Sequence, residues 1–375
     1  MTRSLVLPAV LILLMPMAVL SLAKGGKQAL ASSKDLMYRY AEVARFKAGA
    51  DPYQLSSMTY PPTALPVFTP LVAPFGPNGV KWAWLLGNLA TLAVLCWAVV
   101  RVWGEGWPPW LKAALVLTVA ASNPVRWGIG LGQFHLIPTT LMVLATLAVR
   151  GRRQVLAGAL VGIALAKPTM VLPFLGVWAV KGHWRALAVA IAVQGALFLG
   201  ASAWLGMDPM NLVREWLATA KGELGAGSID VPTLIRESWS EASALGTTLI
   251  VLLIAFALTF AYRRRPEPAL VAFSLFNAAV FTYHRPYDLV LLVPPFASAI
   301  ASARGSRGGQ GVAGWLLAAV FALVLIVPRP PIGSGRFEAW YDGTIVVLAY
   351  VLLARNLLDL ARSKGNDPSE LPRIA

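Results

Sequence analysis

The sequence predicts an all-helical protein that crosses a membrane many times, and two observations support this prediction. The 375 residues are 57% hydrophobic and only 13% charged, whereas a soluble domain carries about 25% charged residues. Several apolar stretches, among them 5–23 and 186–206, approach the length of about 20 residues that a helix needs to span hydrocarbon. We therefore expect one integral membrane domain over residues 1–375.

The charges indicate topology and not nucleic-acid binding, although the net charge is +15. The basic residues lie in short clusters between apolar runs, which is typical of cytoplasmic loops. The clusters that we place in the cytoplasm are Arg3, Arg150, Arg152, Arg153, Lys181, Arg185, Arg263–Arg265, Arg304, Arg307 and the C-terminal tail. The single cysteine, Cys96, excludes a disulfide framework and a thiolate metal site.

About twelve crossings follow from this orientation. The predicted spans are 4–23, 80–102, 111–122, 134–149, 155–166, 168–180, 186–204, 246–262, 269–283, 287–302, 312–327 and 341–358. Residues 24–60 and 205–245 are expected to form two extracytoplasmic loops. The pair 155–180 is either a hairpin folded at Lys167-Pro168, which we favour because basic clusters flank both ends, or one long tilted helix.

The first 23 residues have a second interpretation, since Ser21-Leu22-Ala23 resembles a signal-peptide cleavage site. We favour a retained helix, because the apolar stretch is long and more helices follow. The apolar run 60–76 is not counted as a span, since its five prolines each remove a helix donor. We predict a broken or re-entrant element there, which protein or a cavity must surround at membrane depth.

The first loop is unusually basic for an extracytoplasmic segment. Residues 35–49 carry Leu36, Tyr40, Val43 and Phe46 at near-helical spacing. This pattern favours an amphipathic helix that lies on the membrane surface, with its positive charges toward lipid headgroups or a phosphate-bearing substrate.

Acidic residues are scarce, which narrows the search for a catalytic carboxylate. Early in the chain the candidates for the outer face are Asp35, Glu42 and Asp51. Asp35 follows the first helix closely, where an anchored helix can hold a general base within hydrogen-bond reach of its proton. The alternatives are a capping box from Ser32 to Asp35 and a simple turn at Asp51-Pro52.

The segment 123–138 is expected to form an outer turn before a helix, with Gln133 and His135 as polar groups at its border. Gly128, Gly130 and Gly132 would let backbone or a ligand approach closely. The alternative is that these polar groups cap a helix and form interhelical hydrogen bonds.

Basic groups beside apolar runs are candidates for binding a phosphate. Lys167 lies among apolar residues and needs a counter-charge, unless it reaches the interface. His284, Arg285 and Asp288 meet at the outer end of a predicted helix pair, where Arg and protonated His can both donate to phosphate. The alternative is an Arg285–Asp288 ion pair with a capping His. With only three histidines in the chain, a His-rich metal site is implausible.

Several short motifs appear in the order of a known family. They are Asp35 after the first helix, Asp51–Tyr53 followed by Tyr60–Pro62, Asn123–Gln133 before a helix, Ala166–Pro168, and His284–Asp288. The chain resembles glycosyltransferase family 87, membrane enzymes of the GT-C superfamily that use polyprenyl-phosphate mannose.

This resemblance implies a GT-C fold and an inverting, metal-independent transfer that needs no cofactor. The expected donor is a polyprenyl-phosphate sugar, the partners are a glycolipid or glycan acceptor and membrane lipids, and the site faces outward from the inner (plasma) membrane. By position, Asp35 corresponds to the catalytic base and His284 to a histidine near the donor phosphate. The other expected substrate-binding residues are Lys167, Arg285, Gln133, His135, Asp288, Tyr60 and Tyr53.

Two other functions are compatible with the sequence. Broken helices and an intramembrane Lys167 also fit a secondary transporter or lipid flippase. However, no inverted repeat is apparent, and acidic residues are scarce within the predicted spans. A non-catalytic assembly partner is the third possibility.

Overall fold

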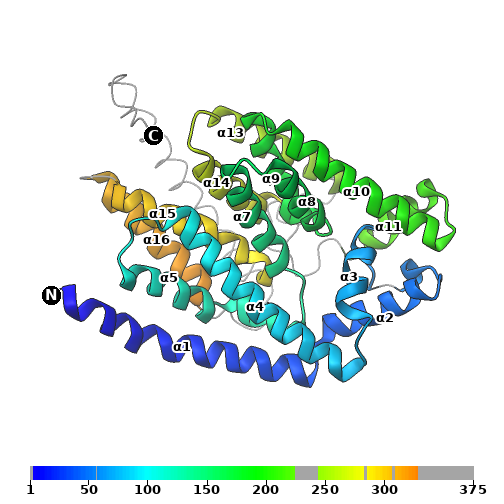
Figure 1. The fold of residues 1–375 in the computed structure, drawn as a ribbon, viewed down its shortest axis with the longest axis horizontal. Coiled ribbons are helices and arrows are strands. Elements are labelled where there is room, and N and C mark those ends of the chain that lie inside the picture. Colours follow the sequence, from blue (N-terminus) through cyan, green and yellow to red (C-terminus); the bar gives the residue numbers. More distant parts are fainter. Residues whose placement is uncertain (1–2, 56, 224–243, 283–284, 306–308, 328–375) are drawn as a thin grey trace.

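The computed structural model describes residues 3–55, 57–223, 244–282, 285–305 and 309–327. Every regular element in these ranges is a helix, which confirms the all-helical prediction (Figure 1). The elements are α1 (Arg3–Ala31), α2 (Lys34–Lys47), η1 (Pro52–Gln54), α3 (Ala64–Val72), α4 (Pro77–Trp103), α5 (Pro109–Ala121), α6 (Asn123–Leu131), α7 (Leu136–Arg150), α8 (Gln154–Ala164), α9 (Pro168–Lys181), α10 (Trp184–Leu205), α11 (Pro209–Glu223), α13 (Ala244–Ala261), α14 (Glu267–Phe281), η2 (Pro286–Leu292), α15 (Val293–Gly305) and α16 (Gly309–Ile326).

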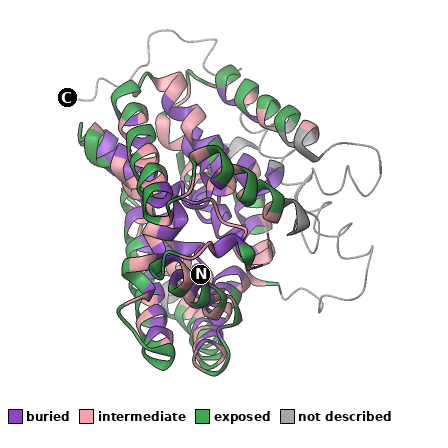
Figure 2. Ribbon diagram, turned by 90° about the vertical axis from the view of Figure 1, so that its right-hand side faces the viewer, coloured by how far each residue is buried: buried purple, intermediate pink, exposed green. Residues whose placement is uncertain are grey.

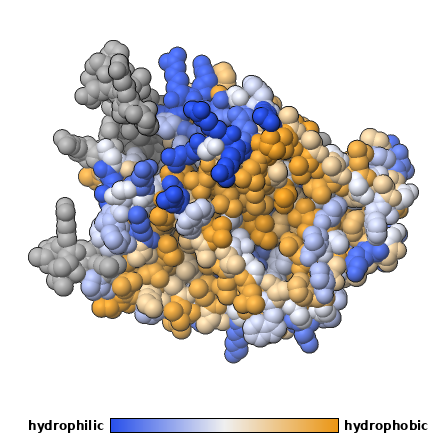
Figure 3. All heavy atoms as spheres, viewed as in Figure 1, coloured by the Kyte–Doolittle hydropathy of each residue, from blue (hydrophilic) through white to orange (hydrophobic). Residues whose placement is uncertain are grey.

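Four helical stretches among the described residues are long and apolar enough to cross a membrane, namely Pro8–Ala31, Pro77–Trp103, Trp184–Leu205 and Pro286–Gly305. Large apolar side chains on their outer faces are exposed, such as Ile12 at 72% and Leu199 at 60%. Figure 3 shows hydrophobic residues over much of the surface beside a hydrophilic patch. A continuous apolar surface of this kind suits lipid, and we treat the chain as a membrane protein.

The predicted number of twelve crossings stays a prediction. Seven further apolar helical stretches among the described residues are only 10–17 residues long, which is shorter than the four candidate spans. The predicted span 341–358 lies outside the described residues. Most of the predicted spans nevertheless coincide with helices, within a few residues at each end.

The first helix is longer than expected. It continues to Ala31, so Lys24 and Lys27 belong to α1 and not to a loop. The chain then turns sharply at Ser33, whose φ of 40° lies in the left-handed region, and α2 begins at once. The start of the first predicted loop is therefore wrong by about two helical turns.

Helix α2 forms over the amphipathic segment, and its apolar face is covered by protein, while its predicted place at the membrane surface stays a prediction. Leu36 and Val43 pack with Phe68 of α3 and Trp84 of α4, and they are buried. Phe46 packs with Leu212 of α11. The apolar face of α2 therefore contacts protein, and Figure 1 shows α2, α3 and α11 together at the end of the molecule remote from the N-terminus.

The proline-rich run folds as the short helix α3. Its nine residues extend about 13 Å, whereas the hydrocarbon core is about 30 Å thick. This helix is too short to cross the bilayer. Its re-entrant character stays a prediction.

The chain reverses direction between α8 and α9, as predicted. A Cβ at Gly158 would meet Val189, and one at Gly162 would meet Val193, so α8 and α10 run parallel along each other. Because α9 connects them, it must run back, which excludes a single tilted helix over 155–180. The two helices of this reversal pack mainly against other partners, α8 on α7 and α10 and α9 on α14.

The core lies in the middle of the helix bundle, where Figure 2 shows buried residues inside and exposed residues outside. Two aromatic contacts illustrate it, Phe276 with Phe321 at 5.8 Å between ring centroids and Phe174 with Trp178 at 5.2 Å. This packing places the start of α2, α7, α9 and η2 at the same end of the bundle, which we call the Asp35 end. The opposite end, which we call the basic end, carries Arg101, Arg150, Lys181, Arg263 and Arg304.

Candidate active site

Asp35 lies in the first turn of α2 and is half-buried. Its Oδ2 accepts a hydrogen bond from Nε2 of Gln133, a residue 98 positions away in the sequence. The N-cap of α2 is Ser33, which makes no side-chain capping bond. The capping-box interpretation from Ser32 is therefore wrong, and the carboxylate is directed toward the segment that follows α6.

The C-terminal turn of α6 holds Gln133 in this position. Gly132 adopts φ 79°, and the N–H of Gln133 donates to the carbonyl of Gly128 at 2.8 Å. Together with the bond from the N–H of Gly132 to the carbonyl of Ile129 at 3.2 Å, this forms a Schellman motif, which requires a left-handed residue at this step. A Cβ on Gly132 would also overlap Leu36 of α2, so the glycine allows α2 and Gln133 to approach each other.

The predicted outer turn at 123–138 is largely the short helix α6, and its glycines make room for protein rather than for a ligand. A Cβ on Gly130 would lie 2.5 Å from Oε1 of Gln28, and one on Gly128 would overlap the ring of His135. His135 is fully buried, with Nδ1 at 3.3 Å from the carbonyl oxygen of Gln133. Its ring contacts Tyr287 edge to face, with centroids 6.1 Å apart.

Lys167 and Asp288 form a buried ion pair between the break before α9 and the start of η2. Nζ of Lys167 also lies 5.2 Å from the centre of the Tyr287 ring. The backbone N–H of Arg285 donates to Oδ2 of Asp288 at 3.3 Å. Lys167 thus has the counter-charge that a buried amine requires, and it does not extend to the interface.

Tyr60 connects the carboxylate side of the site with the basic side. Its hydroxyl donates to Oε1 of Gln133 at 3.4 Å. Burial raises the pKa of Tyr60, the charges of Lys167 and Arg39 lower it, and those of Asp288 and Asp35 raise it again. The hydroxyl therefore stays protonated as a donor, within electrostatic reach of all four charged groups.

A second buried ion pair supports Tyr60. Nη1 of Arg39 lies 2.6 Å from Oε2 of Glu42, and the guanidinium lies 4.7 Å from the centre of the Tyr60 ring. Ser57 donates to Oε1 of Glu42 at 2.8 Å, and Tyr53 donates to the carbonyl of Tyr60 at 3.0 Å. Together these bonds fix the segment 57–60 between α2 and the site.

The structure gathers most of the predicted site residues. Asp35, Gln133, His135, Lys167, Asp288 and Tyr60 form one connected cluster, and Tyr53 lies behind Tyr60. His284 lies outside the described residues. Asp51 accepts a bond from the N–H of Tyr53 at 2.9 Å, as expected for a turn.

Sequence reasoning missed Tyr287 and the role of Arg39. Tyr287 stands between Arg285 and Asp288 in the sequence, and this aromatic beside charged groups is a signal that could have identified it. Arg39 appeared to be one of several loop cations. Its partner Glu42 follows three positions later, a spacing that places both on one helix face.

The chemistry available here combines one carboxylate with buried donors. Asp35 can accept a proton, since the amide of Gln133 donates a hydrogen bond to one carboxylate oxygen but does not transfer its proton. Lys167 can stabilise negative charge where water is largely excluded. Tyr60 and Tyr287 each add a hydroxyl and an aromatic ring near these charged groups.

Comparison with known proteins identifies the family. The model of glycosyltransferase family 87 matches residues 58–295. This range contains Tyr60, Gln133, His135, Lys167 and Asp288, while Asp35 precedes it. No curated protein matches the chain. Since the family model covers more than half of its residues, the chain belongs to glycosyltransferase family 87.

Proposed function

We propose that this glycosyltransferase moves mannose from a polyprenyl-phosphate donor to a hydroxyl of a lipid or glycan acceptor, with inversion and without a metal ion. The single observation that supports this most is the position of Asp35. Its carboxylate is held by Gln133 in the same cluster as the cation Lys167. A base and a phosphate-binding cation must lie on opposite sides of the sugar for such a transfer.

Asp35 is proposed as the general base. It takes the proton from the acceptor hydroxyl while that oxygen forms a bond to the anomeric carbon. The bond between the anomeric carbon and the phosphate oxygen breaks, and the electron pair leaves with the polyprenyl phosphate. Gln133 orients the carboxylate through its amide N–H, and Tyr60 orients Gln133 in turn.

Lys167 is proposed to stabilise the charge that develops on the leaving phosphate. In this structure its ammonium contacts the carboxylate of Asp288. A donor phosphate would bind the ammonium either in place of that carboxylate or beside it. His284 and Arg285, which can also donate to phosphate, directly precede η2 in the chain. Electrostatic stabilisation by prepositioned donors of this kind is often the largest contribution to catalysis.

We propose that the Asp35 end faces outward from the inner (plasma) membrane. The support is the distribution of basic residues, since Arg150, Lys181, Arg263 and Arg304 gather at the opposite end. Cytoplasmic loops are enriched in Arg and Lys. The donor and acceptor would then meet the enzyme from the outer leaflet.

The test uses purified full-length protein, a synthetic polyprenyl-phosphate mannose and an extract of membrane glycolipids as acceptors. We expect release of polyprenyl phosphate together with a mannosylated product. Asp35→Asn should lower the rate at least about 100-fold, the scale of a lost general base, with an unchanged melting temperature.

Asp51→Asn is the matched control, because an Asn side-chain oxygen can still accept the Tyr53 N–H bond. It should keep wild-type activity. Full activity of Asp35→Asn would remove the base assignment. Transport of the donor across proteoliposomes without any covalent product would favour the flippase alternative instead.

A further inference from the structure

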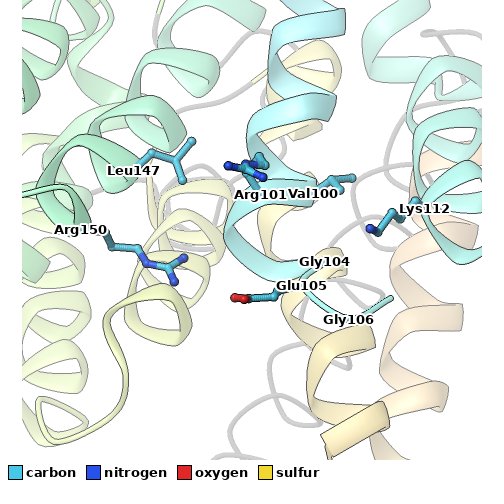
Figure 4. Close-up of a pocket in the computed structure, with 8 residues that line it drawn as sticks. All are labelled: Val100, Arg101, Gly104, Glu105, Gly106, Lys112, Leu147 and Arg150. Carbon is cyan, nitrogen blue, oxygen red and sulfur yellow. The ribbon is translucent and has the colours of Figure 1, made fainter. Parts of the chain in front are cut away.

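A hollow at the basic end takes no part in the proposed reaction. It has a volume of about 420 Å³ and is lined by Val100, Arg101, Gly104, Glu105, Gly106, Lys112, Leu147 and Arg150. Figure 4 shows Arg101, Lys112 and Arg150 around it, from α4, α5 and α7. Helix α7 begins directly after His135 of the active-site cluster and ends at Arg150 beside this hollow, so the two sites lie at opposite ends of the helix.

The charge around the hollow favours an anion. Three basic side chains and one acidic side chain line it. Arg101 and Lys112 make no ion pair within the part of the chain that the structure describes. Arg101 and Arg150 lie in the last turns of α4 and α7, where they also offset the negative end of each helix dipole.

The backbone beside the hollow is held by two of the surrounding arginines. Nη1 of Arg150 donates to the carbonyl of Val102, and Nη2 of Arg304 donates to the carbonyl of Gly106, each at 3.4 Å. The first bond ties the end of α4 to α7, and the second ties the turn 104–106 to α15. The hollow therefore has a defined wall between helix ends.

Apolar side chains precede the arginines of the hollow on two of its helices. On α4, Val94 and Trp97 are exposed at 39% and 55%, and they precede Arg101 at helical spacing on one face. On α7, Leu144 and Leu147 are half-buried and precede Arg150 at intervals of three residues. Since α4 and α7 pack against each other, two apolar stripes end in two arginines.

We propose that this hollow binds the headgroup phosphate of an anionic phospholipid, whose acyl chains lie along Val94, Trp97, Leu144 and Leu147. A free phosphate ion would use only the cations, whereas a lipid uses the cations and the apolar stripes together. The volume also falls within the range of about 300–1,000 Å³ that is usual for small-molecule sites.

The experiment measures lipid bound to the purified full-length protein in detergent by native mass spectrometry. Phosphatidylglycerol, phosphatidylcholine and inorganic phosphate serve as probes. We expect phosphatidylglycerol to bind about tenfold more tightly than phosphatidylcholine, and inorganic phosphate at equal concentration not to displace it. The double variant Arg101→Gln/Arg150→Gln should weaken phosphatidylglycerol binding roughly 10- to 30-fold.

The matched control is Arg152→Gln/Arg153→Gln, which removes the same charge from exposed positions that do not line the hollow. It should keep phosphatidylglycerol binding within about twofold, and both double variants should melt like the wild type. Equal binding of the two lipids would overturn the proposal. So would displacement by inorganic phosphate, or an equal loss in the control variant.

Discussion

Two buried ion pairs at the Asp35 end differ in how the chain builds them. Arg39 and Glu42 are three residues apart on α2, with side chains 8% and 0% exposed. Lys167 and Asp288 are 121 residues apart, with side chains 11% and 2% exposed. The first pair can form as soon as α2 is helical, whereas the second forms only when the start of α9 packs against η2.

The partners of the two pairs indicate different roles. Arg39 and Glu42 hold Ser57 and the ring of Tyr60, so they support a loop behind the site. Lys167 contacts the ring of Tyr287 and is one of the charges that act on Tyr60. We infer that the local pair is scaffolding and that the long-range pair contacts substrate.

The largest effect is expected from Lys167→Met. This change removes one partner of a buried ion pair, and breaking such a pair from one side costs about 3–5 kcal/mol of unfolding free energy. Transfer activity should fall at least about 100-fold, because the cation that we propose for the leaving phosphate is lost. Thermal unfolding and turnover of the purified protein measure the two effects.

The double variant Lys167→Met/Asp288→Asn separates those effects. Removing both charges should restore much of the stability, since the buried negative charge of Asp288 is removed together with the ammonium of Lys167. Activity should stay low. Restored activity in the double variant would show that Lys167 is scaffolding like Arg39, and the comparison would fail.

A smaller effect is expected when the helix packing behind the long-range pair is changed. A Cβ in Gly128→Ala would overlap the ring of His135, which must then move against Tyr287. We expect roughly 1–3 kcal/mol of destabilisation from overpacking, with a measurable loss of turnover. Gly87→Ala is the control, since no atom lies within 4 Å of its added Cβ, and it should be neutral or up to about 1 kcal/mol stabilising.

Breaking the local pair should harm stability more than catalysis. Arg39→Met leaves Glu42 buried without its counter-charge, so the melting temperature at pH 8 should fall clearly. At pH 5 the loss should be smaller, because a protonated Glu42 needs no cation. Turnover per folded molecule should change less than about threefold, and a complete loss of turnover would place Arg39 in the reaction itself.

The smallest effect concerns the pH dependence of the wild type. Burial raises the pKa of Glu42 above its ordinary value of 4.5, although the charge of Arg39 and the bond from Ser57 oppose this. Compared with the unfolded chain, the folded state therefore keeps the proton of Glu42 up to a higher pH. The resulting contribution to stability is present below pH 4.5 and is lost as the pH rises through the higher folded pKa. Glu42→Gln should remove this fall, as melting curves of both proteins between pH 4 and 8 would show. Parallel curves for the two proteins would contradict the prediction.

Part of the candidate site was predictable because it depends on residue types in an unusual setting. A lysine among apolar residues at Lys167-Pro168 needs a counter-charge, and a proline there starts a new helix. Asp35 was identifiable because acids are scarce in the first half of the chain. The sequence could not show which carboxylate pairs with Lys167 or which amide holds Asp35, since both partners are about 100 residues or more away.

Hydropathy and basic clusters alone determined that this chain is helical, apolar and built to lie in a membrane, because a helix in lipid must satisfy its backbone within itself. The tertiary structure decided that α2 packs on protein, that α6 is a helix whose glycines admit Leu36 and His135, and that Asp35, Tyr60 and Lys167 share one cluster. The physical reason is that periodicity shows which face of a helix is apolar but not what covers that face, and close approach at a glycine depends on the shape of a distant neighbour.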